Sequence, residues 1–102
     1  MAILYLTDGT RQEIVKPDGF SLTELHELVG GYIEMITLGF TTTGERLAFI
    51  IDEEGKLKEK QVNTFATALW HSRFTAPVND VIVGDALLVT IEHEGQDDEK
   101  VS

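Results

Sequence analysis

The chain has 102 residues, the size of one small domain, and its 42% hydrophobic and 25% charged composition is typical of a globular protein rather than a disordered or repetitive one. Its 18 acidic residues outnumber its 8 basic ones, which gives a formal net charge of −10. A protein this acidic repels the phosphates of a nucleic acid and attracts basic partners, so direct nucleic-acid binding is not expected. The absence of cysteine excludes disulfides, thiolate metal sites and cysteine nucleophiles.

The start of the chain predicts a cytoplasmic protein. Residues 1–8 lack the basic start, apolar run and cleavage site of a signal peptide. No apolar run approaches the ~20 residues that a membrane-spanning helix needs. We therefore expect no contact with a membrane.

A β-hairpin is expected at the N-terminus. An apolar run over 3–6 and an alternating segment over 11–16 flank Asp8-Gly9, a dipeptide typical of two-residue hairpin turns. Pro17 should end the second strand because proline cannot donate a hydrogen bond to a sheet.

A short helix should follow. Ser21 and Glu24 have the spacing of a capping box, and apolar residues at helical spacing continue to Val29. Gly30 is a typical residue at the end of a helix. The alternation over 32–38 then predicts a strand.

The middle of the chain predicts further strands. The continuous apolar run over 47–51 is typical of a strand covered on both faces, and we expect it at the centre of the sheet. Residues 52–55 should form a tight turn. The alternation over 56–62 puts its three lysines on one side, which predicts an exposed edge strand.

The last part of the chain predicts a helix, strands and a tail. Asn63 is a favourable N-cap for a helix over about 64–73, anchored by Trp70. A loop over 75–80 should lead to a short strand at 81–83, a kink at 84–85 and a last strand over 86–91. Residues 92–102 carry a net charge of −4, from five carboxylates and one lysine, and are predicted to be a mobile acidic tail.

These elements predict an α+β fold with a largely antiparallel sheet and two short helices. The domain should occupy residues 1–91 and the tail residues 92–102. The pattern does not decide whether both helices pack on the same face of the sheet.

Catalytic and metal-binding patterns are weak. The three histidines lack the spacing that would place two ligands on one helix face, and no serine has a neighbouring base and acid that would complete a triad. Asp52, Glu53 and Glu54 precede a glycine, but a calcium loop counted from Asp52 would need glutamate where Asn63 stands. The chain is therefore predicted not to be an enzyme and to need neither cofactor nor metal.

The glycine pair is better explained by the end of a helix than by a phosphate-binding loop. Gly30 and Gly31 follow the predicted helix instead of preceding one, and the other residues of a dinucleotide or nucleotide fingerprint are missing.

Glu34 is the most informative single residue. It shares one face of its predicted strand with Tyr32 and apolar neighbours, where a buried carboxylate would need a partner. One interpretation is a partly exposed sheet face with Glu34 in water; the other is a polar site formed by Tyr32, Glu34 and Asn63. The residues assigned to ligand or partner binding are Gly30, Gly31, Tyr32, Glu34, Asp52, Glu53 and Asn63.

Four stretches resemble, in this order, a family of small proteins of unknown function. They are L-T-E-L-H-E-L-V-G-G-Y-I-E at 22–34, I-D-E-E-G-K-L at 51–57, V-N-T-F-A-T at 62–67 and D-V-I-V-G-D at 80–85. The resemblance covers residues 20–89, departs from the family pattern at Asp52 and Gln61, and implies a protein of bacteria, phages and plasmids. It implies no activity.

Three functional hypotheses follow. The first is a non-enzymatic accessory protein of a mobile element that binds a protein partner, in its sharpest form an acidic inhibitor of a host nucleic-acid-binding or defence protein. The second is a protein that binds or sequesters a small ligand near Gly30–Glu34 and Asn63. The third, a nucleic-acid binder, rests only on Lys56, Lys58 and Lys60. A homo-oligomer is compatible with the first two.

Overall fold

The computed structural model describes residues 2–73, 77, 79–93 and 99–101. These residues form one sheet of six strands and two helices, so the predicted α+β class is confirmed. The elements are β1 (Ala2–Tyr5), β2 (Arg11–Ile14), α1 (Leu22–Val29), β3 (Ile33–Phe40), β4 (Arg46–Asp52), α2 (Thr64–His71), β5 (Ala86–His93) and β6 (Glu99–Val101). The strand pairs are antiparallel.

The strand order is β2-β1-β5-β4-β3, with β6 also paired to β5. The centre of the sheet is therefore β5, and the prediction that residues 47–51 hold that place is wrong. β4 is nonetheless an interior strand, and Ala48, Phe49 and Ile50 are 0% exposed. An apolar run indicates cover on both faces, but it cannot tell one interior strand from another.

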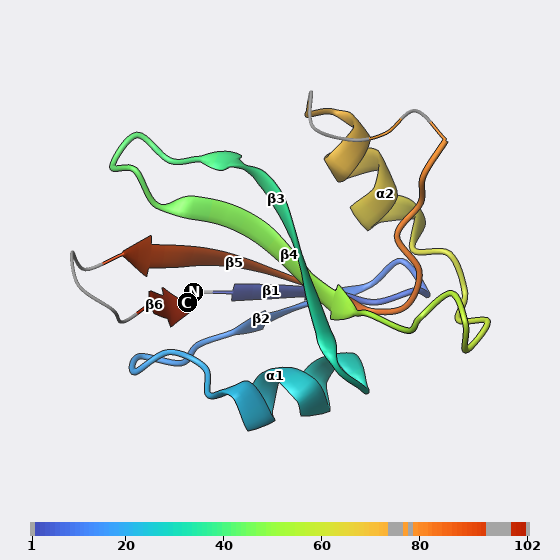
Figure 1. The fold of residues 1–102 in the computed structure, drawn as a ribbon, viewed down its shortest axis with the longest axis horizontal. Coiled ribbons are helices and arrows are strands. Elements are labelled where there is room, and N and C mark those ends of the chain that lie inside the picture. The colour runs from blue at the N-terminus through green and yellow to red at the C-terminus, as the bar shows by residue number, and fades with distance from the viewer. Residues whose placement is uncertain (1, 74–76, 78, 94–98, 102) are drawn as a thin grey trace.

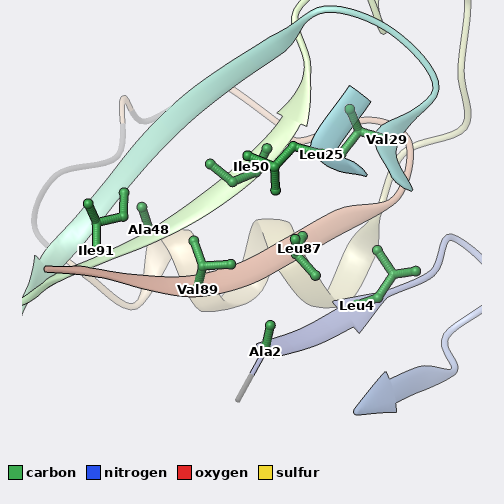
Figure 2. Packing of buried hydrophobic residues seen from close by; sticks show 9 residues of the cluster. All are labelled: Ala2, Leu4, Leu25, Val29, Ala48, Ile50, Leu87, Val89 and Ile91. Atoms are coloured by element: carbon green, nitrogen blue, oxygen red, sulfur yellow. The ribbon is translucent and has the colours of Figure 1, made fainter. Parts of the chain in front are cut away.

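The helices pack on opposite faces of the sheet, which the sequence left open (Figure 1). Leu25 and Val29 of α1 share one buried cluster with the strand residues Leu4, Ile50 and Leu87 (Figure 2). Ala66 and Trp70 of α2 lie in a second cluster, which also contains Phe49, Ile51 and Ile82. Burying both sheet faces in this way supplies most of the apolar area that leaves water on folding.

Local signals position the ends of α1 as predicted. The Ser21 hydroxyl accepts from the Glu24 N–H at 3.2 Å, and the Glu24 carboxylate accepts from the Ser21 N–H at 2.9 Å. Gly30 ends the helix at φ 84°, in the left-handed region that glycine enters without strain, and its N–H donates to His26 O.

The N-terminal hairpin is confirmed with a different turn. The Leu6 carbonyl accepts from the Gly9 N–H at 3.1 Å, which places Thr7 and Asp8, and not Asp8 and Gly9, at the centre of the turn. Gly9 follows at φ 90°, a position that favours glycine after a turn of this kind.

The predicted edge strand over 56–62 is wrong. Residues 53–59 form turns, and Val62 makes an isolated bridge with Val83, which is also all that forms of the strand predicted at 81–83. Lys58 and Lys60 both contact the carboxylate of Asp52. Their alternation in the sequence therefore reflects a shared partner and not a shared side of a strand.

The C-terminal strands extend beyond the predicted domain boundary at 91. β5 continues to His93, and β6 pairs Val101 with Ile91. β1 pairs with β5 only at Ala86–Leu88, so the next part of that side of β5 is open to β6. Residues 92–93 and 99–101 of the predicted tail therefore belong to the sheet; residues 94–98 and 102, like residues 74–76 and 78 of the predicted loop, lie outside the described residues.

Candidate binding site

Several predicted site residues meet where the end of α1 approaches the end of β4. We call Gly30, Gly31, Asp52, Lys58 and Lys60 the lysine junction. The ammonium groups of Lys58 and Lys60 each lie 2.8 Å from Asp52 Oδ2. Lys60 also donates to Val29 O at 2.9 Å and Lys58 to Gly30 O at 3.3 Å. The two lysines thus bind the carbonyls at the C-terminus of α1, where positive charge is stabilising.

Asp52 is ionised in this junction. Its burial, with 3% of the residue exposed, would raise the pKa of its carboxyl group. Hydrogen bonds from Lys58, Lys60 and the Glu54 N–H outweigh that effect and lower the pKa from 3.8 to about 2. The same contact raises the pKa of Lys58.

Gly31 is closely approached by the side chains of this junction. A Cβ atom at Gly31 would lie 2.6 Å from Lys58 Nζ and 2.8 Å from Asp52 Oδ1, both closer than real contacts. The space beside the glycine pair is therefore filled by the protein's own side chains. The lysine junction joins α1, β4 and the loop over 53–60.

Asn63 also has a role within the fold. It is 1% exposed, and its Oδ1 caps α2 by accepting from the Ala66 N–H at 3.1 Å. Its amide donates to Tyr5 O and Gly84 O, both at 3.0 Å. These two bonds use both amide hydrogens, so Asn63 has no donor left for Glu34 or for a ligand.

Tyr32 and Glu34 are exposed, and the structure does not bring them together with Asn63. Tyr32 is 66% exposed, and its ring contacts that of His26 edge-on. Glu34 lies in β3 opposite Ile51 of β4, on the face of the sheet that α2 covers. Of the two interpretations of Glu34, the exposed one is confirmed.

Glu34 and Glu53 do meet, at a cavity of about 180 Å³ on the α2 side of the sheet, which we call the Trp70 cavity. Its polar lining residues are Glu34, Asp52, Glu53, Lys56 and Asp80. Its apolar lining residues are Ile36, Ile51, Trp70, Val81 and Val83. Carboxylates beside apolar walls give this cavity the character of a binding site for a group with a positive end.

The charges of the cavity are only partly balanced within the protein. Lys56 forms an ion pair with Asp80, and that contact lowers the pKa of Asp80. The Asp52 carboxylate is used by the lysine junction. Glu34 and Glu53 form no ion pair with any residue of the described part, so the cavity has two uncompensated negative charges.

Sequence reasoning missed Trp70, Lys56 and Asp80 as parts of a site. Trp70 has the spacing of a core residue, and Lys56 has that of a strand edge. Trp70 reaches the cavity from α2, Lys56 from the turns after β4 and Asp80 from the segment before β5, and no local pattern specifies how these segments pack. The usable signals were Glu34 and the acidic run at 52–54.

Other function classes find little support in the described residues. Each of the lysines behind the nucleic-acid hypothesis, Lys56, Lys58 and Lys60, is paired with an aspartate. No group of three or more side chains placed to bind a metal ion occurs among the residues that the structure describes. Neither α1 nor α2 has the length and apolar character needed to cross a membrane.

Comparison with protein families gives one decisive match. A family model described as "Domain of unknown function (DUF3846)" matches residues 1–102. The chain belongs to the DUF3846 family. Comparison with curated proteins found no match, and comparison with solved structures found none either. The expected membership of a family of unknown function is thereby confirmed, and DUF3846 membership assigns the chain no activity.

Proposed function

We propose that this DUF3846 protein is a small acidic accessory protein of a phage- or plasmid-type mobile element, located in the cytoplasm, that acts without catalysis by binding a basic protein partner. One observation carries the proposal: Lys16, Lys56, Lys58 and Lys60 are each paired with a carboxylate of the protein itself. Further carboxylates are exposed without an ion pair to the described residues, namely Asp8, Glu13, Asp18, Glu27, Glu34, Glu53, Glu54 and Glu59.

This charge distribution favours a basic partner. Carboxylates that lack an internal cation attract basic surfaces over a Debye length of ~10 Å at 0.1 M salt, which raises association rates and selects against acidic partners. In its sharpest form, the protein competes with nucleic acid for the basic groove of a host nucleic-acid-binding or defence protein. The mobile-element origin rests on the sequence resemblance alone.

Native mass spectrometry of the tagged protein, purified gently from its own host, tests this proposal. We expect a co-purified protein that dissociates as salt is raised. Two variants with equal loss of charge map the contact: Glu13→Gln/Asp18→Asn/Glu27→Gln near α1, and Glu53→Gln/Glu54→Gln/Glu59→Gln in the loop after β4. At least one should weaken capture. The proposal is contradicted if capture of the partner changes neither with salt nor in either variant. The same spectrum gives the oligomeric state.

A second candidate function is favoured by the Trp70 cavity. A protein that sequesters a small cationic ligand would use Glu34 and Glu53, whereas the glycine pair and Asn63 are occupied by internal contacts. In the same experiment this function predicts a small adduct that disappears in Glu34→Gln, with no protein partner.

A further inference from the structure

The Trp70 cavity has the size and walls to hold one side chain of a partner. Its volume is about 180 Å³, and a cavity of ~150 Å³ accommodates a benzene-sized group. Ile36 and Ile51 contribute apolar surface from β3 and β4, and Val81 and Val83 contribute it from the segment before β5. These walls suit a side chain with a methylene stem.

Two carboxylates without an ion pair to the described residues, Glu34 and Glu53, line the cavity from neighbouring backbone positions. Glu34 pairs with Ile51 across the β3–β4 ladder, and the Glu53 N–H continues that ladder by donating to Tyr32 O at 2.8 Å. Glu53 is two residues beyond Ile51, so Glu34 and Glu53 are diagonal neighbours on one face, with Cα atoms roughly 7–8 Å apart. Their repulsion is relieved by a cation that reaches both, and within the described residues no cation does so.

Trp70 supplies an independent indication of a ligand. The residue is 6% exposed and lines the cavity, yet its indole N–H has no hydrogen-bond partner among the residues that the structure describes. No buried polar side-chain atom of those residues lacks a partner, so the indole nitrogen is open to solvent. An N–H donor on a residue that lines a cavity suits an acceptor brought by a ligand, such as a peptide carbonyl.

We propose that the Trp70 cavity receives an arginine side chain of the protein partner, with the guanidinium between Glu34 and Glu53. The inference rests on the proposed function, since it names the group by which the basic partner is recognised. A guanidinium presents five N–H donors in a planar fork and bridges two separated carboxylates, whereas an ammonium is a compact point charge. A metal ion fits less well because the described residues offer no group of three ligands.

Nuclear magnetic resonance of the full chain tests this inference directly. Trp70 is the single tryptophan of the sequence, so one indole N–H signal reports on the cavity. The 15N-labelled protein is titrated with acetyl-Gly-Arg-Gly-amide and with the same peptide carrying citrulline, which is uncharged and nearly isosteric, in place of arginine. We expect a saturable shift of the indole signal with the arginine peptide and none with the citrulline peptide.

Variants locate the binding group. Glu34→Gln/Glu53→Gln should weaken arginine-peptide binding by about fivefold or more, because it removes both charged acceptors. Glu13→Gln/Glu27→Gln removes the same charge elsewhere and should leave the affinity within about twofold, since distant surface charges are screened. All four carboxylates are exposed, and the dispersion of the spectrum verifies that each variant is folded.

The inference is overturned if the indole signal does not shift saturably, if the citrulline or a lysine peptide binds as tightly, or if both double variants weaken binding equally. Failure of this inference can be distinguished from failure of the proposed function. If the protein captures a partner but does not bind the arginine peptide, only the assignment of the cavity is contradicted. If the arginine peptide binds but the protein captures no partner, the arginine-binding cavity is supported and the proposed function is contradicted.

Discussion

Asp52 shows how one buried carboxylate orders three parts of the chain. It lies at the end of β4 and binds Lys58 and Lys60, which in turn bind the last carbonyls of α1. Because the folded state lowers the pKa of Asp52 from 3.8 to about 2, ionised Asp52 stabilises the fold. This contribution is complete above the pKa of the unfolded chain and is lost as the pH falls toward 2.

Replacement of Asp52 by asparagine tests that account. We expect Asp52→Asn to lower the free energy of unfolding at pH 7 by about 2 kcal/mol or less, since one pKa unit is ~1.4 kcal/mol and the lysine ends reach solvent. The difference from wild type should shrink between pH 5 and pH 2. Denaturant unfolding of wild type and variant across this range measures it. A constant difference would mean that Asp52 acts through packing alone.

The roles of single residues were predictable from the sequence where the contacts that define them are local. Ser21 and Gly30 were identified as helix ends because their hydrogen bonds join neighbours in the chain. The role of Asp52 was not, because its partners arrive through a turn whose path depends on α1. The alternating lysines led to the wrong prediction of a strand. Side chains that contact one common acceptor can have the same two-residue spacing as side chains on one face of a β-strand.

Among the elements, α2 depends on Asn63 for more than a cap. The side chain caps the helix and also binds β1 through Tyr5 O and the segment before β5 through Gly84 O. At an ordinary N-cap, asparagine and aspartate are nearly equivalent. At Asn63 an aspartate would bury a charge against two carbonyl oxygens that have lost their donors.

Aspartate substitutions at both N-caps separate these roles. Asn63→Asp should destabilise the protein by roughly 2–4 kcal/mol, because the carbonyls of Tyr5 and Gly84 lose their donors and a carboxylate is buried without a cation. Ser21→Asp, at the exposed cap of α1, should change stability by less than about 0.5 kcal/mol. Thermal unfolding of the two variants at pH 7 gives the comparison. Equal effects would show that Asn63 serves only as a cap.

Elements were predictable in type more than in arrangement. The helices and the strands over 33–40, 46–52 and 86–93 follow from periodicity, which reports which side of a segment faces the core. Strand order and the face that each helix covers depend on contacts between distant segments. The Trp70 cavity lies between such segments, so its parts could not be assembled from sequence even though Glu34 was singled out.

At the scale of the whole molecule, the net charge of −10 opposes compaction. Apolar clusters on both sheet faces outweigh this repulsion. Among the described residues most exposed carboxylates form no ion pair, so added salt relieves more repulsion than it weakens attraction. The buried pairs of Asp52 are screened much less than surface charges are, so salt leaves their contribution nearly intact.

We therefore expect the melting temperature to rise by a few degrees when sodium chloride increases from 20 to 500 mM at pH 7, because ~1 kcal/mol shifts the Tm of a domain this size by roughly 4–8 °C. Calorimetry of wild type and Asp52→Asn should give the same salt response in both. A Tm that falls with salt would mean that surface ion pairs such as Lys16–Glu24 outweigh the repulsion, and that the exposed carboxylates are not free to attract a basic partner.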